Sequence, residues 1–400
     1  MYKICYMKRR FLFFELEKYL QVPEAILVTG MRQVGKTTLL KQLFDSIEGP
    51  KLWFDLDNPL DQLVFEEQDY NAIFQRFRDQ TGSPSDRISI FIDEIQNYPP
   101  VTKVVKYLID HYGVKFYLTG SSNFYLKNLF PESLAGRKFL FVLPPLNFRE
   151  YQYFKSDSAT PEVDKSDIWQ ILGGKDHVTY IKLEHTYADY IEFGGFPRVV
   201  TAANREEKVM VLRNIFASFF KKDLRILSDF KDITELRNLI LLLVPRVGSM
   251  LDITRISSEM GVERLKIYHY LEFLQGIFLI HLLPRFSKGV DRSVAGGKKV
   301  YFADTGLLNL IGKVNESQLF ENAIINQLAN YGPVSFYNHR NVSEIDAIVN
   351  KEIALEIKLR GTPSDLNKLK KQCEKLGIAN YAVISKYFSE EKEIYPGLLV

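Results

Sequence analysis

The segment Gly30–Thr37 has the residue types and the spacing of a phosphate-binding loop. Its sequence, GMRQVGKT, fits the pattern G-x-x-x-x-G-K-[ST] at every position. Glycines let backbone N–H groups curl around phosphate oxygens, and a helix that begins near Lys36 points its positive dipole end at them. Lys36 is expected to reach the β- and γ-phosphates, and the Thr37 hydroxyl to ligate Mg²⁺. An apolar run before the loop and a helical segment after it supply the context that this pattern requires.

A second segment supplies the carboxylates that such a site needs. Residues 88–92 form a continuous apolar run of the kind found in buried parallel strands, and Asp93 and Glu94 follow it directly. Such a strand delivers the side chains at its carboxyl end to the crevice where ligands bind. We expect Asp93 to hold Mg²⁺ and Glu94 to orient and deprotonate an attacking water. A glutamate directly after the aspartate favours nucleotide hydrolysis over binding alone.

Further polar residues extend the predicted nucleotide site. Ser121, in the segment LTGSS, is expected to hydrogen-bond the water or the γ-phosphate; the alternative is a solvated strand end. Arg137 is predicted to stabilise charge on the transferring phosphoryl group, within its own chain or toward a neighbour; a surface arginine is the equal alternative. The full set of predicted nucleotide-binding residues is Gly30, Arg32, Gln33, Val34, Gly35, Lys36, Thr37, Thr38 and Ser121.

A separate group of charged residues lies toward the end of the chain. Asp346, Glu356 and Lys358 form the pattern D-x₉-E-x-K. Glu356 and Lys358 share one strand face, because side chains two residues apart point the same way. Two carboxylates on neighbouring strands can hold Mg²⁺ or Mn²⁺, and a lysine can activate water for attack on a phosphodiester; Glu321 is a candidate further ligand. The alternatives are solvated strand faces or a nuclease fold kept only for structure.

The elements that must position these residues alternate between strand and helix. The predicted strands are 25–29, 51–56, 88–92, 115–118 and 139–143, and the helices among them are 37–44 and 101–111. This alternation predicts a parallel sheet covered on both faces. Between about 233 and 303, the order helix, helix, glycine turn, helix and hairpin predicts a winged helix. Helix and strand patterns alternate again from residue 319 onward.

Composition limits the class of protein. Of 400 residues, 46% are hydrophobic and 25% charged, which excludes wholesale disorder and fibrous repeats. The formal net charge of +3 provides no global basic field for nucleic acid. The two cysteines, Cys5 and Cys373, exclude a disulfide framework and fit a reducing cytosol, so a cytoplasmic location is expected. No apolar run approaches the ~20 residues that span a bilayer, so no membrane partner is expected.

Six motifs together resemble a known family. They are GMRQVGKT at 30–37, FIDEIQ at 91–96, LTGSS at 118–122, PLNFRE at 145–150, GGFP at 194–197 and VYFADTG at 300–306. The chain resembles prokaryotic AAA-type ATPases that carry a C-terminal DUF4143 domain. The resemblance implies an additional-strand P-loop core, a helical lid, a winged helix and a nuclease-like domain of the PD-(D/E)xK type. The polar stretch 156–175 departs from the family pattern.

We therefore predict an α/β chain with five parts. They are an N-terminal helix (1–22), a P-loop AAA-type ATPase core (23–150), a helical lid with a polar insertion (151–232), a winged helix (233–303) and a restriction-endonuclease-like domain (304–400). The predicted function is Mg²⁺-dependent ATP binding and hydrolysis, coupled to DNA or a protein partner through the last two domains. The alternatives are an ATP-regulated, metal-dependent DNA nuclease and a nucleotide switch for protein partners with a degenerate nuclease fold.

Basic residues define where DNA would be contacted. The candidates are Arg285, Lys288, Arg292, Lys298 and Lys299 of the wing, Arg264, Lys266 and His269 of the recognition helix, and His339, Arg340, Lys368, Lys370 and Lys371 near the C-terminal acids. Protein docking by the winged-helix module is about as well supported by the sequence as DNA recognition.

Overall fold

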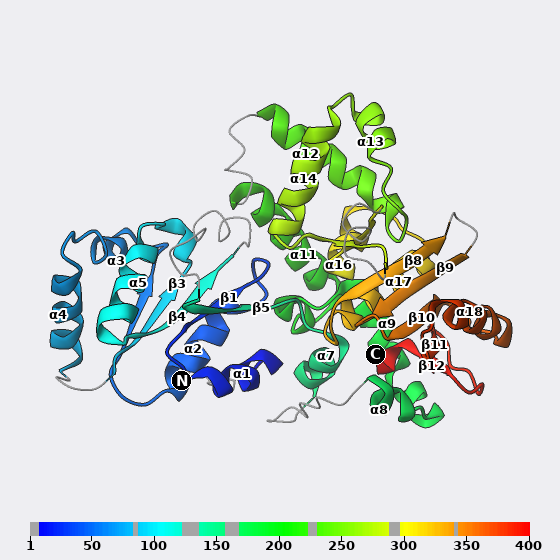
Figure 1. Cartoon of the computed structure of the whole chain (residues 1–400), viewed down its shortest axis with the longest axis horizontal. Helices are drawn as coiled ribbons and strands as arrows, with labels where there is room; N and C mark the ends of the chain where they lie inside the picture. Colours follow the sequence, from blue (N-terminus) through cyan, green and yellow to red (C-terminus); the bar gives the residue numbers. More distant parts are fainter. Residues whose placement is uncertain are drawn as a thin grey trace. The chain divides into compact units, whose positions relative to one another are not determined.

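The computed structural model describes residues 8–82, 87–121, 136–156, 168–222, 230–287, 297–339 and 343–400. The chain divides into two compact units, one built mainly from residues 1–144 and the other mainly from residues 145–400 (Figure 1).

The first unit is built around a parallel sheet. Its elements are α1 (Phe11–Leu16), η1 (Glu17–Tyr19), β1 (Ala25–Thr29), α2 (Lys36–Ser46), β2 (Lys51–Asp55), α3 (Pro59–Leu63), α4 (Tyr70–Thr81), β3 (Ser89–Asp93), η2 (Ile95–Asn97), α5 (Val101–Tyr112), β4 (Lys115–Gly120) and β5 (Lys138–Val142). The five strands are ordered β2-β3-β4-β1-β5 and all pair in parallel. Because β4 lies between β1 and β3, this is the additional-strand P-loop fold that the sequence predicts.

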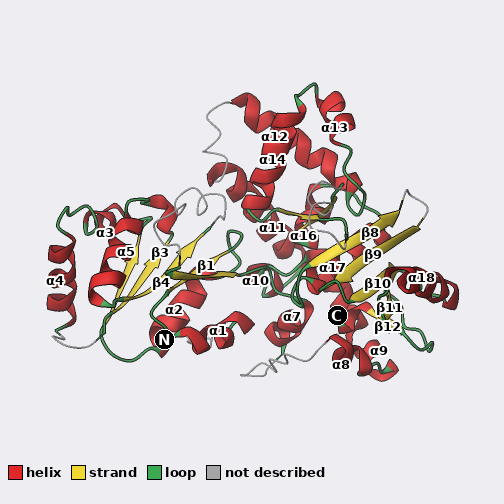
Figure 2. Ribbon diagram, in the orientation of Figure 1, coloured by secondary structure: helices red, strands yellow, loops and turns green. Residues whose placement is uncertain are grey.

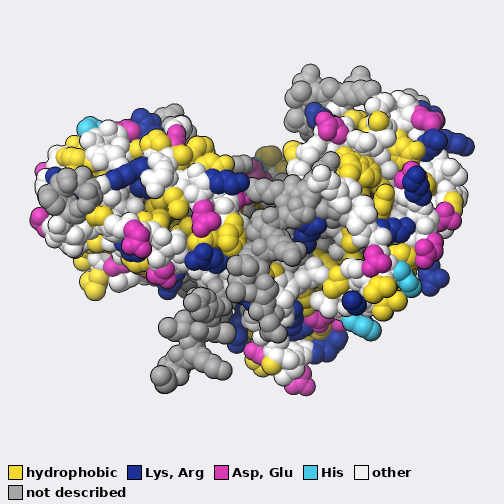
Figure 3. All heavy atoms as spheres, turned by 90° about the horizontal axis from the view of Figure 1, so that it is seen from below, with side chains coloured by type: hydrophobic (Ala, Val, Ile, Leu, Met, Phe, Trp, Pro, Cys, Tyr) yellow, Lys and Arg dark blue, Asp and Glu magenta, His cyan; other side chains and the backbone are white. Residues whose placement is uncertain are grey.

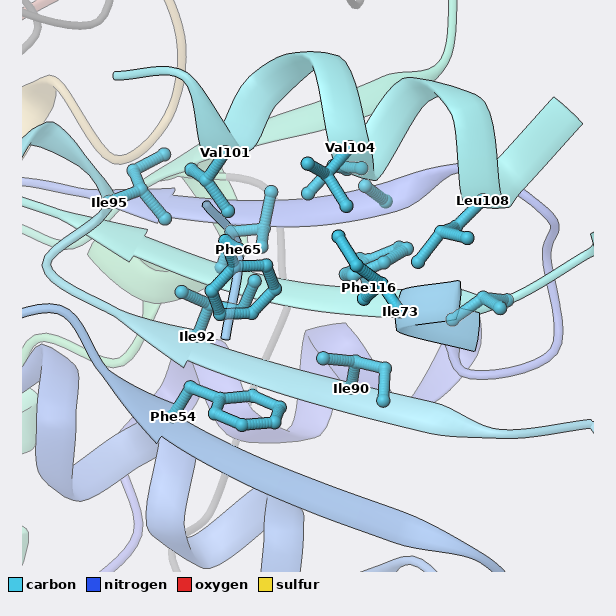
Figure 4. Packing of buried hydrophobic residues seen from close by; sticks show 14 of the residues in the cluster. Phe54, Phe65, Ile73, Ile90, Ile92, Ile95, Val101, Val104, Leu108 and Phe116 are labelled. Carbon is cyan, nitrogen blue, oxygen red and sulfur yellow. The ribbon is translucent and has the colours of Figure 1, made fainter. Parts of the chain in front are cut away.

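The packing of β3 explains why three consecutive residues, 90–92, are apolar. Successive side chains of a strand point to opposite faces. Ile90 and Ile92 belong to the cluster that α5 covers (Figure 4). Phe91 points to the other face, where its ring lies 5.1 Å from that of Phe44 on α2. Helices on both faces therefore require apolar side chains at 90–92, between the half-buried Ser89 and Asp93 at the strand's end.

Hydrogen bonds from one buried lysine side chain to main-chain carbonyls connect the N-terminal segment with the sheet. The buried ammonium of Lys115, at the start of β4, donates to the carbonyl oxygens of Tyr19 (3.0 Å), Val22 (3.0 Å) and Glu24 (2.6 Å). Burial lowers the pKa of Lys115 to about 8. The segment that precedes β1 is therefore part of the folded unit.

The second unit begins with helices and ends with a mixed sheet (Figure 2). Its elements are α7 (Phe148–Lys155), α8 (Ile168–Gly173), α9 (His177–Phe193), α10 (Pro197–Val200), α11 (Arg205–Lys222), α12 (Phe230–Leu243), η4 (Val244–Arg246), α13 (Ile253–Met260), α14 (Arg264–Gly276), β6 (Ile280–Leu283), β7 (Lys299–Phe302), α16 (Thr305–Ile311), α17 (Glu316–Leu328), β8 (Val334–His339), β9 (Ser343–Val349), β10 (Ile353–Lys358), α18 (Pro363–Leu376), β11 (Asn380–Ser385), β12 (Ile394–Pro396) and η5 (Gly397–Leu399). Strands β6 and β7 form an antiparallel pair, and the last five strands are ordered β12-β11-β10-β9-β8.

Some elements differ from the sequence expectation. Helices α3 and α4 and the short strand β12 have no predicted counterpart. Helix α8 lies inside the polar stretch 156–175 that departs from the family pattern, and it buries Ile168 and Leu172. Two apolar anchors in a polar stretch are enough to dock one short helix, but they are too few to produce a clear periodic pattern. Residues 157–167 of that stretch lie outside the described residues.

Three of the family-like motifs are joined by hydrogen bonds around the buried carboxylate of Asp304 and the main chain of Gly195. Asp304 accepts hydrogen bonds from the N–H groups of Gly195 (2.7 Å) and Leu307 (2.9 Å), so it joins the segment 194–197 to the N-terminus of α16. Burial raises the pKa of Asp304 to about 6. The Gly195 carbonyl accepts from the N–H of Leu146 (2.7 Å). These motifs therefore hold the second unit together.

Charge is mixed over the surface. On the face drawn in Figure 3, Lys and Arg side chains lie among Asp and Glu side chains rather than in one large patch. Among the described residues, no helix combines the length and the apolar character needed to cross a membrane.

The close approach of Gly195 to the main chain of Leu146 predicts a loss of stability when Gly195 is replaced. A Cβ atom at Gly195 would lie 2.0 Å from the Leu146 carbonyl oxygen, whereas one at Gly173 meets nothing within 4 Å. Gly195→Ala should lower the free energy of unfolding by about 3 kcal/mol or more, because backbone must move. Gly173→Ala, the control, should change it by less than about 1 kcal/mol. Denaturation monitored by Trp169 fluorescence in a Trp53→Phe background measures both; equal effects would refute the packing argument.

Candidate functional site

The loop between β1 and α2 is shaped by positive φ angles and by a close backbone contact. Gly30, Gln33 and Gly35 have φ angles of +147°, +63° and +100°. A Cβ atom at Gly30 would lie 2.2 Å from the Leu143 carbonyl oxygen, so no larger residue fits beside the chain that follows β5. Because Gly35 has no side chain to cap α2, the first N–H groups of this helix are left for another acceptor.

Lys36 places a positive charge inside this loop. Only 5% of the residue is exposed, and its ammonium donates to the carbonyl oxygens of Gly30 (3.0 Å) and Met31 (2.8 Å). These two bonds curl the loop around the ammonium. A loop of backbone N–H groups with a lysine at its centre fits the phosphates of a nucleotide.

Asp93 connects the loop to two strands. One carboxylate oxygen accepts from the Thr37 hydroxyl at 2.7 Å, and the other accepts from the Thr119 hydroxyl of β4. Burial raises the pKa of Asp93, while the hydrogen bonds from Thr119 and Thr37 oppose this shift. A hydroxyl and a carboxylate side by side are ligand types that magnesium uses when a nucleotide supplies further oxygens. The residues here therefore fit the predicted magnesium position.

Glu94 is held by a residue to which the sequence analysis gave no role. Glu94 has a φ of +54°, and its carboxylate accepts a hydrogen bond from the side-chain amide of Gln96. The same amide nitrogen donates to the Ser121 hydroxyl (3.0 Å), and the Ser121 N–H donates to the side-chain oxygen Oε1 of Gln96 (3.3 Å). Gln96 thus joins the predicted general base to the end of β4. Its only sequence signal is its place in the motif FIDEIQ.

Arg10 is a second residue that sequence reasoning missed. Its guanidinium donates to the carbonyl oxygens of Val34 in the loop and Pro144 after β5, at 2.8 Å each. Only 4% of the residue is exposed. In the sequence Arg10 looks like part of a basic run before an apolar stretch. The structure instead makes it a clamp between the loop and the chain that follows β5.

The remaining predicted residues fall into two groups. Arg32 and Thr38 are half-buried and Gln33 is exposed, all in or next to the loop. Arg137 lies elsewhere: it precedes β5 and pairs with Asp110 at 2.6 Å. Because β5 runs parallel to β1, Arg137 lies at the edge of the sheet opposite the loop. The structure therefore does not bring Arg137 to the nucleotide site of its own chain; a role toward a neighbour stays a prediction.

The C-terminal acids do come together. The ammonium of Lys358 lies 2.7 Å from the Glu356 carboxylate and 3.6 Å from that of Asp346. The other predicted ligand, Glu321 of α17, reaches the same group through Lys299, whose ammonium lies 3.8 Å from Glu321 and 4.0 Å from Asp346. Burial, followed by the nearby Asp346 carboxylate, raises the pKa of both Glu321 and Glu356.

This arrangement does not fit the metal that the nuclease-like pattern implies. Two lysine ammonium groups already lie among the carboxylates. Within the described ranges, no group of three or more His, Cys, Asp or Glu side chains could hold a metal ion. No chemical step is therefore derived through a metal at Asp346.

The predicted DNA-contacting residues are only partly described. Lys266 of α14 is committed to Asp232 (2.6 Å) and Glu235 (2.7 Å), whereas Arg264 and His269 are exposed. Arg285 donates to the Asn338 carbonyl, and Lys299 is buried in the acidic group. Lys298, His339, Lys368, Lys370 and Lys371 are exposed. The predicted residues Lys288, Arg292 and Arg340 lie outside the described ranges.

Family models match three consecutive parts of the chain. Residues 22–152 match an AAA domain and residues 316–394 a domain of unknown function, DUF4143. The chain contains an AAA domain and a C-terminal DUF4143 domain. This confirms the pair that the motifs predicted. Between them, residues 184–318 match a further domain of unknown function, DUF8612, which the sequence analysis did not name.

Curated relatives match most of the chain, and their names assign no activity. An uncharacterized protein of Haemophilus influenzae is 27% identical over 339 residues, which cover 81% of this chain and 79% of that protein. An uncharacterized protein of Mycobacterium tuberculosis is 24% identical over 388 residues, which cover 92% of this chain and 78% of that protein.

Solved structures align only distantly. The Aeropyrum pernix ORC1 protein in complex with DNA has a TM-score of 0.31 and 12% identity, over 76% of this chain and 92% of that one. The Thermotoga maritima RuvB Holliday junction branch migration motor has a TM-score of 0.30 and 16% identity, over 68% of this chain and 86% of that one. Structural similarity with TM-scores of 0.31 and 0.30 assigns neither a partner nor a substrate to this chain.

The Arg10 clamp predicts a loss of stability in the AAA domain. Arg10→Ala leaves two carbonyl oxygens without a charged donor and should lower the free energy of unfolding by about 2–3 kcal/mol. Arg10→Lys should recover only part of it, because one ammonium lacks the fork of a guanidinium. Fluorescence of Trp53 in a Trp169→Phe background reports the first unit. The exposed neighbour Arg9, as Arg9→Ala, is the control and should cost less than about 1 kcal/mol; an equal cost would argue against a clamp.

Proposed function

We propose that this chain binds ATP with magnesium and hydrolyses it. The observation that carries the proposal is the 2.7 Å hydrogen bond between the Thr37 hydroxyl and the Asp93 carboxylate, which joins the glycine loop to the acidic end of β3. Lys36 lies at the start of the same helix as Thr37, and Glu94 follows Asp93. The predicted phosphate, magnesium and water ligands therefore lie at one edge of the sheet, where α/β proteins bind ligands.

Each residue has a distinct part in this proposal. Bound magnesium would neutralise charge on the phosphates. Lys36 exchanges its hydrogen bonds to loop carbonyls for bonds to phosphate oxygens, and the N–H groups of the loop and of α2 surround these oxygens. Thr37 and Asp93 hold the cation, Asp93 mostly through water. Glu94 orients the attacking water and takes its proton.

Substitutions in the two motifs separate binding from hydrolysis. Lys36→Ala should weaken nucleotide binding and remove ATPase activity. The substitution removes the ammonium group that lies inside the phosphate loop. Glu94→Gln should lower kcat by about 100-fold or more while nucleotide binding persists, because the amide cannot accept the water's proton. A coupled ATPase assay and a fluorescent-nucleotide titration measure both. Turnover in Lys36→Ala equal to wild type would contradict the proposal.

Gln96 supports the proposal as a positioning residue. Its amide contacts Glu94 and Ser121, and it makes no described contact with the phosphate loop. Its part is to orient the Glu94 carboxylate toward the place of the attacking water.

Gln96→Ala should therefore lower kcat about tenfold and leave KM for ATP nearly unchanged, since orientation is lost but phosphate binding is not. Steady-state kinetics over a range of ATP concentrations separates the two constants. Gln75→Ala, at an exposed position of α4, is the matched control and should change neither. A rise in KM with kcat unchanged would place Gln96 in nucleotide binding instead.

Coupling to a partner is a second part of the proposal. Helix α14, the recognition-helix candidate, exposes 63% of Leu265 and 55% of Tyr268, while its Lys266 is committed to Asp232 and Glu235. Exposed apolar side chains beside a neutralised lysine favour a protein surface over phosphate groups. We therefore favour a protein partner over DNA for α14, and a fluorescence-anisotropy titration with duplex DNA at rising salt tests this preference.

A further inference from the structure

The strongest feature outside the nucleotide site is a group of opposite charges around the buried Lys299, here called the lysine-bridged cluster. It comprises Lys299 of β7, Glu321 of α17, Glu344 and Asp346 of β9, and Glu356 and Lys358 of β10. Four carboxylates therefore share two ammonium groups. Carboxylates this close are stable in a protein interior only when cations compensate their charge.

Lys299 is the central cation of this cluster. Its ammonium lies 2.6 Å from Glu344, 3.8 Å from Glu321 and 4.0 Å from Asp346, and only 4% of its side chain is exposed. Lys358 compensates the other side, at 2.7 Å from Glu356. Asp346 also accepts a hydrogen bond from the Ile357 N–H at 2.8 Å. The carboxylates are thus satisfied by groups of this chain.

Hydrogen bonds between β7 and α17 fix the backbone position of Lys299. The buried side chain of Asn322 on α17 accepts from the N–H of Phe302 (2.8 Å) and donates to its carbonyl (2.7 Å). The Tyr301 hydroxyl donates to Glu321 at 2.7 Å. Three bonds therefore hold β7 against the helix that carries one of the carboxylates, and Lys299 enters the cluster from a fixed strand.

A second set of contacts joins the same hairpin to the C-terminal sheet. After β6, the Phe286 N–H donates to the Phe336 carbonyl (2.6 Å), and the Phe336 N–H donates to the Pro284 carbonyl (3.1 Å). The chain that leaves β6 thus runs beside β8. The hairpin and the sheet form one continuous structure around the cluster.

A divalent cation and the Lys299 ammonium cannot occupy this position together. Magnesium and manganese need carboxylate oxygens at about 2.0–2.2 Å. The carboxylates here are spaced around an ammonium at larger distances, in keeping with the absence of a metal-holding group among the described residues. Either the Lys299 ammonium or a divalent cation can lie among these carboxylates, but not both.

We propose that Lys299 is the resident cation of the lysine-bridged cluster, so that the cluster is closed to divalent metals and serves as the electrostatic joint between the β6–β7 hairpin and the C-terminal sheet. The nuclease-like pattern of Asp346, Glu356 and Lys358 is then a structural contact in this chain. Removal of Lys299 opens the place to a metal. This inference is independent of the proposed ATPase activity.

Metal binding to the full chain tests the proposal. After treatment with EDTA, Mn²⁺ is titrated and the free ion is measured by electron paramagnetic resonance. Lys299→Met should bind one more Mn²⁺ per chain than wild type, because three carboxylates lose their ammonium. Lys299→Arg keeps the cation, and Lys298→Met changes an exposed neighbour; both should bind as wild type does. Any Mn²⁺ that binds near Asp93 binds to every variant equally, so it does not affect the difference between the variants and wild type.

Stability gives a second readout. Lys299→Met should melt at a lower temperature than wild type, and Mn²⁺ should raise its Tm but not that of wild type, since a ligand stabilises the state that binds it. If Lys299→Met does not fold, the double variant Lys299→Met with Glu344→Gln keeps the net charge of wild type and takes its place in both measurements.

Two results would overturn the proposal. One is a Mn²⁺ site in wild type that Asp346→Asn removes, because the cluster would then hold a metal despite Lys299. The other is equal Mn²⁺ binding by wild type and by the folded variants that lack Lys299, because the lysine would then exclude nothing.

Discussion

The carboxylate of Asp93 organises the first unit more than any other group. One of its oxygens accepts from Thr37, which follows β1, and the other from Thr119, at the end of β4. One buried carboxylate at the end of β3 therefore connects the end of β4 with the first turn of α2, the helix that follows the glycine loop. The glycine loop, the helix that follows it and the strand of the predicted base are all placed relative to this group, and burial raises its pKa because it is shielded from water.

Much of the nucleotide site could be predicted because its signals are local. The glycines and Lys36 stand within eight consecutive positions, and Asp93 ends an apolar run whose burial on two faces the structure confirms. Arg10 could not be found in this way, because its acceptors are main-chain carbonyls, one of them 134 residues away. Every residue has a main-chain carbonyl, so the residue types at 34 and 144 do not indicate that these carbonyls accept from Arg10. Arg137 precedes β5, and a residue before a parallel strand lies at the sheet edge opposite the loop, so only its predicted role toward a neighbour and the surface alternative remain.

The C-terminal unit shows a different limit. The spacing of Asp346, Glu356 and Lys358 correctly places them together, since strand geometry is periodic. The sequence gives no sign that Lys299, 47 positions before Asp346, enters the same group, because that contact depends on how β7 lies against α17. The motifs at 194–197 and 300–306 carry part of the family resemblance, and in the structure the Gly195 N–H donates to the Asp304 carboxylate. Their role in this chain is therefore a structural contact.

The N-terminal contacts bear on how fragments of this chain are cut. The AAA family match begins at residue 22, yet Lys115 donates to carbonyls of Tyr19 and Val22, and Arg10 donates to the phosphate loop. A recombinant piece trimmed to the match would remove one of the three carbonyls that accept from the buried Lys115 ammonium, that of Tyr19, and would leave the carbonyls of Val34 and Pro144 without the Arg10 guanidinium. The contacts that fix the phosphate loop thus extend upstream of the region that the family model matches.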